Sequence, residues 1–270
     1  MIGPGSASAV IARNNVRVTG RPGGRPIVFV HGFGCDQTLW RFVAPAFEDR
    51  FRVVLYDHVG SGASDLAAYD PARYASLDAY ASDLLEICRE LDLSDAVLVG
   101  HSVGAMIAAL AAVQDPRRFA KLVLIAPSPR YLDDDGYAGG FSRADVDGLL
   151  ESLAGNYLGW SAAMAPAFAG APAGTELAGV LTNAFCRTDP AIAHQFARVT
   201  FLSDTRAALP NVSLPSLIVQ CSDDFVVPCA VGDYMQGAMP DAELVVLDTV
   251  GHCPHLSSPG STIDAIGRFL

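Results

Sequence analysis

Ser102 lies at the centre of the pentapeptide Gly100-His101-Ser102-Val103-Gly104. An apolar, β-branched run over residues 96–99 precedes it and predicts a buried strand, and an alanine-rich run over 105–112 follows it and predicts a helix. Strand, Gly-x-Ser-x-Gly and helix form a nucleophile elbow, a sharp turn that presents a serine hydroxyl at the end of a sheet. The predicted chemistry is attack of the serine oxygen on a carbonyl carbon, and the alternative is a purely structural glycine-rich turn.

A candidate acid and a candidate base follow Ser102 in the chain order that elbow hydrolases use, which is serine, acid, histidine. Asp223 and Asp224 follow the apolar run 217–221 after one serine, and His252 and His255 follow the apolar run 244–247. The carboxyl ends of parallel strands border the crevice where open α/β sheets bind ligands. One aspartate and one histidine would therefore complete a triad in which the histidine takes the serine proton and the aspartate orients it.

A second loop could supply the oxyanion hole. The apolar run 27–30 leads into His31-Gly32-Phe33-Gly34, where glycines allow close approach of the backbone to a substrate oxygen. We expect the backbone N–H groups of Phe33 and Val103 to be the donors, although His-Gly could also mark a plain turn. Asp57 lies in a third polar loop, and we interpret it as a loop-bracing carboxylate rather than a catalytic one.

The elements that must position these loops predict an α/β fold. Apolar strand patterns alternate with helical patterns, which is typical of a mostly parallel central sheet flanked by helices. From 131 to 206 the strand pattern stops, and we expect an inserted helical lid. We predict a single domain over 1–270 with a core of about 9–130 and 207–270. A hairpin is expected to start within 9–19. The main predicted strands are 27–30, 52–56, 96–99, 121–125, 217–221 and 244–247. The main predicted helices are 38–48, 78–91, 105–112 and 262–270.

Composition narrows the class of protein. The net charge of −11 disfavours nucleic acid and anionic membrane surfaces as partners. No run approaches the ~18 apolar residues of a membrane helix, and no signal-peptide pattern is visible. The six cysteines show no paired spacing, so we interpret them as reduced thiols of a cytoplasmic protein.

Motifs along most of the chain resemble the α/β-hydrolase superfamily and, within it, the RsbQ-like group of bacterial stress regulators and the related plant karrikin and strigolactone receptors. The matches in the lid point to this subfamily, because lid segments vary widely across the superfamily. The matching stretches span roughly 27–260 and are 31–34, 56–64, 100–104, 128–132, 139–141, 156–160, 186–190, 201–204, 220–224 and 251–257.

The resemblance implies specific site residues. It places the acid at Asp224, four residues before Pro228, and the base at His252, the first histidine of His-x-Pro-His, which makes His255 structural. A metal bound by His252 and His255 is the rival interpretation, but no further ligands are evident, so we expect neither a metal nor a cofactor. The resemblance also places five aromatic residues around the substrate pocket: Phe33, Tyr131, Phe141, Trp160 and Phe201.

Such a pocket would suit a small hydrophobic ester or lactone. The resemblance implies a signalling hydrolase that works with a PAS-containing serine phosphatase in a stress pathway. The alternative is a stand-alone carboxylesterase or lactonase with no signalling partner. A non-catalytic binding module is disfavoured because every triad member is present.

Overall fold

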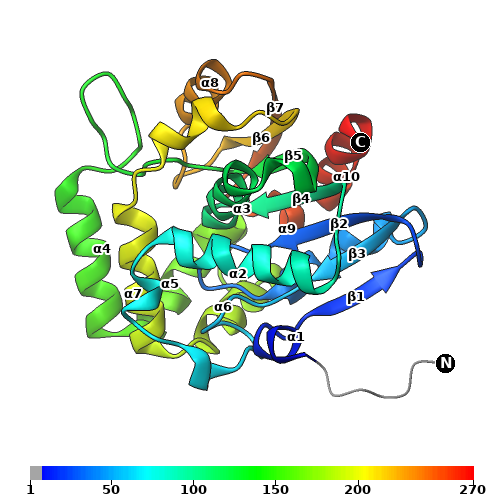
Figure 1. The fold of residues 1–270 in the computed structure, drawn as a ribbon. Helices are drawn as coiled ribbons and strands as arrows, with labels where there is room; N and C mark the ends of the chain where they lie inside the picture. Colours follow the sequence, from blue (N-terminus) through cyan, green and yellow to red (C-terminus); the bar gives the residue numbers. More distant parts are fainter. Residues whose placement is uncertain (1–7) are drawn as a thin grey trace.

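The computed structural model of the protein describes residues 8–270 (Figure 1). Its centre is a sheet of seven strands in the order β1-β3-β2-β4-β5-β6-β7, in which β1 pairs antiparallel with β3 and every other pairing is parallel. The strands are β1 Arg17–Gly20, β2 Arg25–Val30, β3 Phe51–Leu55, β4 Ala96–His101, β5 Phe119–Ile125, β6 Ser216–Asp223 and β7 Ala242–Val250.

Strand β2 is the point at which successive strands change sides: β3 is added on one side of it, and β4 and the later strands on the other. Strand β3 pairs with one edge of β2 and β4 with the other, with Val30 opposite Gly100 in the register of β2 and β4. Loops that leave the carboxyl ends of two such strands diverge and open a crevice between them. The loops after β2 and β4 carry Phe33 and Ser102, so the topology brings both to this crevice.

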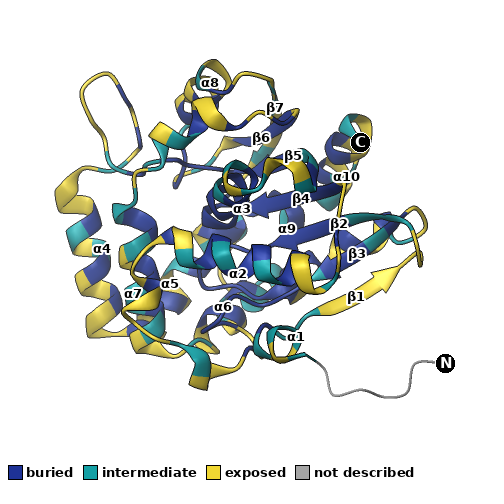
Figure 2. Ribbon diagram, viewed as in Figure 1, coloured by how far each residue is buried: buried dark blue, intermediate teal, exposed yellow. Residues whose placement is uncertain are grey.

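Both faces of the sheet are buried along its central strands β2, β4, β5 and β6, which explains the continuous apolar runs there. In β2, Val28 and Val30 pack on one face, together with helices α2 (Leu77–Glu90) and α3 (Val103–Gln114), whereas Ile27 and Phe29 pack on the other face with Trp40 and the carboxyl-terminal helix. Figure 2 shows the central strands buried between these layers, the edge strand β1 exposed, and exposed residues on the outer helix faces. The flanking helices are α1 Ala9–Arg13, α2 Leu77–Glu90, α3 Val103–Gln114, α8 Cys229–Ala238, α9 Pro254–Ser257 and α10 Pro259–Phe269.

Four further helices lie between β5 and β6, and we call them the helical insertion: α4 Arg143–Gly155, α5 Tyr157–Ala169, α6 Glu176–Cys186 and α7 Pro190–Leu202. Local sequence fixes their ends. Ser142 and Asp145 form a capping box at the start of α4, and Gly170 ends α5 in the left-handed region with φ of 63°. Figure 1 shows the insertion gathered at one end of the sheet, beside the carboxyl ends of the parallel strands.

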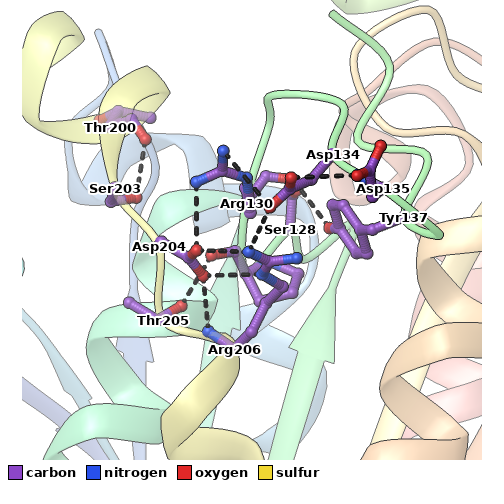
Figure 3. Close-up of polar contacts among 11 residues, drawn as sticks. Ser128, Arg130, Asp134, Asp135, Tyr137, Thr200, Ser203, Asp204, Thr205 and Arg206 are labelled. Atoms are coloured by element: carbon purple, nitrogen blue, oxygen red, sulfur yellow. Dashed lines mark hydrogen bonds and ion pairs between the residues drawn. The ribbon is translucent and has the colours of Figure 1, made fainter.

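Ion pairs join the two chain segments that flank the helical insertion (Figure 3). Arg130, after β5, lies 3.1 Å from Asp204, after α7, and the two residues form a β-bridge. Arg206 contacts both Asp204 and Asp134, at 2.7 and 2.8 Å. We call these four residues the basal ion-pair network. It ties the chain entering the insertion to the chain leaving it.

The structure confirms the predicted α/β architecture with a mostly parallel sheet and corrects two local predictions. The segment 9–19 does not start a hairpin, because residues 9–13 form helix α1 and the following strand β1 pairs with β3 rather than with β2. The helix expected at 38–48 is two short 3₁₀ helices, Gln37–Phe42 and Ala44–Phe47, with Pro45 inside the second. Over the described residues, no helix is both long and apolar enough to cross a membrane.

Candidate active site

The turn between β4 and α3 holds Ser102 in a conformation that few residues adopt. Its φ of 56° and ψ of −127° lie outside the regions that non-glycine residues favour, and the Ser102 amide donates to the Ile125 carbonyl at 2.8 Å. A Cβ on Gly100 would lie 2.5 Å from Ala105 Cα, and one on Gly104 would lie 2.3 Å from the His31 carbonyl oxygen. The glycines therefore let the turn close and let α3 begin against the loop after β2.

A chain of two hydrogen bonds links three side chains from three different loops. His252 Nε2 lies 2.7 Å from Ser102 Oγ, and His252 Nδ1 lies 2.7 Å from Asp224 Oδ2. Backbone contacts fix the histidine, since its amide donates to the Phe168 carbonyl of α5 at 2.9 Å and its carbonyl accepts a hydrogen bond from His101 Nε2 at 2.8 Å. The imidazole is thus held between hydroxyl and carboxylate.

The two neighbouring aspartates lie in different environments. The Asp224 carboxylate is fully buried, and its second oxygen accepts from the Val226 amide at 2.9 Å. Asp223 is exposed, and its backbone carbonyl accepts from the Gly251 amide at 2.8 Å. Asp223 is the last residue of β6 and Asp224 follows the strand, and it is the Asp224 carboxylate that contacts His252.

His255 lies behind the hydrogen-bonded chain rather than in it. Its ring centroid is 4.3 Å from that of His101 and 4.8 Å from that of Trp40. Burial lowers the pKa of His255 to about 3, so the ring is neutral. His101, Cys253 and His255 bring one donor atom each within 4.8 Å of one another, so these three buried side chains could together hold a metal.

The proposed oxyanion donors flank Ser102. Val103 is the first residue of α3, and the first N–H groups of a helix have no partner within the helix. Phe33 follows β2, and its side chain borders the same pocket as Ser102. The positive end of the α3 dipole adds a favourable field for an oxygen that gains negative charge here.

A narrow pocket opens directly above Ser102. Its free space is about 10 Å³, roughly the volume needed for one water molecule. Aromatic rings therefore have to move before an ester can enter. A larger depression of about 710 Å³ lies between α7 and the start of α2, but it contains none of the three hydrogen-bonded residues. The lining residues above Ser102 include Phe33, Tyr131, Phe168, Leu181, Phe185, Thr200, Phe201 and Val226.

The chain matches the alpha/beta hydrolase family over residues 27–265. It is 40% identical over 262 residues to a protein from Oryza sativa subsp. japonica that is named a probable esterase, with 95% of each chain covered. It is 37% identical over 262 residues to "Karrikin insensitive 2 receptor CA" from Petunia hybrida, again with 95% of each covered. A solved hydrolase from Oleispira antarctica superposes with a TM-score of 0.93 at 39% identity, over 97% of this chain and 96% of that one.

The chain belongs to the alpha/beta hydrolase family. This membership confirms the fold class and the prediction of a hydrolase enzyme. The relative from Petunia hybrida confirms the resemblance to the plant group that includes the karrikin receptors.

In this alpha/beta hydrolase, the predicted pocket residues divide into two layers. Phe33, Tyr131 and Phe201 line the pocket, whereas Phe141 and Trp160 do not. Trp160 packs behind the lining, with its ring centroid 6.1 Å from Phe33 and 5.7 Å from Phe185, and Phe141 packs 6.1 Å from Phe201. Neither Phe141 nor Trp160 borders the narrow cavity itself, and their place around the substrate stays a prediction.

Sequence reasoning missed part of the lining. It did not assign to the pocket five further residues that line it: Phe168, Leu181, Phe185, Thr200 and Val226. Helical spacing marks residues that face inward, but it does not separate those that border a cavity from those that pack behind it.

Asp57 has the bracing contacts expected of a structural carboxylate. Its two oxygens accept hydrogen bonds from the Gln37 amide at 2.9 Å, the Ala63 amide at 2.9 Å and the Asn15 side chain at 2.7 Å. It therefore joins three loops.

Proposed function

We propose that the protein is a serine hydrolase that cleaves a small hydrophobic ester or lactone through Ser102, His252 and Asp224. The observation that carries this proposal is the continuous chain from Ser102 Oγ through both nitrogens of His252 to Asp224 Oδ2, with 2.7 Å at each step. Homology supports the same reaction class, because a relative 40% identical to this chain is named a probable esterase.

In the acylation step, Ser102 Oγ attacks the carbonyl carbon as His252 Nε2 takes the hydroxyl proton. The carbonyl oxygen becomes an oxyanion that accepts hydrogen bonds from the amides of Phe33 and Val103. Asp224 keeps the proton on Nδ1 and stabilises the imidazolium. The C–O bond then breaks, and His252 returns its proton to the leaving alkoxide.

In the deacylation step, His252 takes a proton from water, and the hydroxide attacks the acyl carbon. Collapse of the second tetrahedral intermediate releases the acid and returns a proton to Ser102. For a lactone, alcohol and acid are parts of one molecule, so a single hydroxy acid is released. We propose that the helical insertion acts as a lid that shields these steps from bulk water.

The lining favours apolar substrates. The rings of Phe33, Phe168, Phe185 and Phe201 surround the space above Ser102, and no lysine, arginine or carboxylate side chain lines it among the described residues. A charged acyl group would lose its hydration here without gaining a partner, so we propose uncharged substrates.

We propose that this hydrolysis serves signalling, with the stand-alone carboxylesterase or lactonase as the alternative. A relative 37% identical over nearly the whole chain is named a receptor, which supports a sensing role. The RsbQ resemblance suggests a PAS-containing serine phosphatase as partner. Co-purification of such a phosphatase with the protein from its own cells supports the signalling role, and turnover without any such partner favours the alternative.

Covalent labelling tests the catalytic proposal. A small fluorophosphonate should modify Ser102 alone, as shown by peptide mass spectrometry, and should abolish hydrolysis of p-nitrophenyl acetate. The Ser128→Ala variant, which removes another buried serine, should label normally. Modification of a different serine, or full activity after Ser102 is modified, would exclude the proposed mechanism.

A further inference from the structure

Thr200 places an unused hydroxyl in the wall of the pocket. It lies near the end of α7, is 1% exposed, and borders the same cavity as Ser102. Its Oγ1 atom has no hydrogen-bond partner among residues 8–270. Nearly all buried hydroxyls in proteins are hydrogen-bonded, so an unpaired one beside a ligand cavity calls for an explanation.

Other helices of this protein show how such side chains usually find a partner. Where a serine or threonine lies within a helix, its hydroxyl can donate to the carbonyl four residues earlier. The corresponding carbonyl for Thr200 belongs to Phe196, and Thr200 Oγ1 does not bond to it. In Figure 3 the contact drawn at Thr200 is the one its own carbonyl accepts from Ser203. Side chains that do make the bond to the fourth preceding carbonyl are Ser82, Ser161, Thr182, Ser257 and Thr262.

The other hydroxyls of the pocket, those of Ser102 and Tyr131, already have hydrogen-bond partners. Ser102 Oγ lies 2.7 Å from His252 Nε2, and Tyr131 Oη lies 3.3 Å from Ser102 Oγ. Most other lining groups are aromatic or aliphatic and offer Thr200 no acceptor. The hydroxyl is therefore desolvated and free to bond to whatever enters the cavity.

We propose that Thr200 forms a second polar subsite that donates a hydrogen bond to an acceptor oxygen of the substrate, remote from the carbonyl attacked by Ser102. The ligand class is an uncharged ester or lactone that carries an additional ether or carbonyl oxygen, in preference to a plain alkyl ester. This inference rests on the proposed hydrolase function and adds a specificity determinant to it.

The test compares matched esters on matched variants. The probes are p-nitrophenyl methoxyacetate against butanoate, and 3-methoxypropanoate against pentanoate, so that one oxygen replaces one methylene. Thr200→Val replaces the hydroxyl by a methyl group at similar volume, and Thr200→Ser keeps the hydroxyl. Thr182→Val on α6 is the control, because that hydroxyl bonds to the Ala178 carbonyl.

For at least one ether position, the ether-to-alkyl ratio of kcat/KM should fall roughly 5- to 10-fold in Thr200→Val, which is the effect of one hydrogen bond. The ratio should recover in Thr200→Ser and stay unchanged in Thr182→Val. A ratio within about twofold of the wild type in Thr200→Val for both pairs overturns the subsite.

Stability gives an independent readout. Since the hydroxyl has no partner in the free protein, Thr200→Val should unfold at the same temperature as the wild type or a higher one. A lower Tm, by several degrees, would show that the hydroxyl has a structural partner and would overturn the proposal. If the wild type hydrolyses alkyl esters and Ser102 is labelled, a negative result rejects the subsite alone; if neither occurs, the hydrolase function and the subsite fail together.

Discussion

Ser102, His252 and Asp224 lie in loops at the ends of three strands, whereas most of the rings above them come from the helical insertion. At the carboxyl ends of the strands, hydrogen bonds from the backbone fix the polar groups: the Ser102 amide donates to the Ile125 carbonyl, and the Val226 amide donates to the Asp224 carboxylate. In the insertion, Trp160 and Phe185 are positioned by ring packing, with centroids 5.7 Å apart.

The difference teaches that chemistry and selectivity rest on different kinds of interaction. Directional hydrogen bonds at the carboxyl ends of the strands fix atoms to within tenths of an ångström, which proton transfer requires. Ring packing tolerates rearrangement, which a pocket with space for about one water molecule needs before it can admit a substrate. Substitutions of the three hydrogen-bonded residues should therefore remove activity, and substitutions in the insertion should change which substrates are preferred.

The largest effect is expected at the nucleophile. Ser102→Ala should lower kcat for short aryl esters by about a million-fold, as loss of the serine does in a comparable triad. Burst and steady-state kinetics with p-nitrophenyl acetate measure this, and circular dichroism checks the fold. Hydrolysis near the wild-type rate by a folded Ser102→Ala protein would rule out the proposed mechanism.

The next largest effect separates the two aspartates. Asp224→Asn should lower kcat about 10⁴-fold, because an amide in place of the carboxylate favours the wrong tautomer of His252. Asp223→Asn should stay within about twofold, since its side chain is exposed. Parallel kcat measurements decide the matter, and exchanged phenotypes would reassign the acid to Asp223.

The turn that carries Ser102 could be predicted from the sequence because the sequence patterns that specify it are local. Gly100-His101-Ser102-Val103-Gly104 follows an apolar run directly, and the resulting strand, turn and helix form within 19 residues of chain, from Ala96 to Gln114. The choice of Asp224 over Asp223 came from family resemblance, and the buried contact with His252 now gives it a physical reason.

The two layers of the insertion could not be separated from sequence. Trp160 and Phe185 are both apolar residues on the inner face of a helix, and both are nearly fully buried. Which of them borders the cavity depends on how α5 and α6 pack against Phe33, a contact between segments far apart in the chain. The error over 9–19 has a similar origin, because β1 pairs with β3 rather than with β2.

These two layers can be tested against each other. Phe185→Ala enlarges the pocket and should raise kcat/KM for octanoyl relative to acetyl esters by roughly tenfold. Trp160→Ala lies behind the lining, so it should lower the free energy of unfolding by about 3–5 kcal/mol and change that ratio less than threefold. The readouts are urea unfolding and an acyl-chain profile, with fluorophosphonate labelling as the control for an intact site. A larger change of profile in Trp160→Ala than in Phe185→Ala would contradict the assigned layers.

The smallest effect is expected at the basal ion-pair network, where exposed charges join the two ends of the insertion. Removing one carboxylate in Asp204→Asn should lower Tm by about 1–3 °C at low salt, because it breaks contacts with both Arg130 and Arg206. Asp147→Asn, which removes an isolated exposed pair with Arg143 on α4, should lower it by less than about 1 °C.

The dependence of this last effect on pH and salt shows whether charge is the cause. Hydrogen bonds from Arg206 lower the pKa of Asp204 below its ordinary value of 3.8. A carboxylate with a lowered pKa stabilises the fold above its ordinary pKa, and that contribution disappears as pH falls through the lowered value. The Tm difference between wild type and Asp204→Asn should therefore be constant from pH 7 to 5, diminish below about pH 4, and shrink in 1 M salt at pH 7. A difference that persists unchanged at pH 3 and in high salt would mean that Asp204 acts through packing or neutral hydrogen bonds. The ends of the insertion would then be positioned by packing, like its interior, rather than by charge.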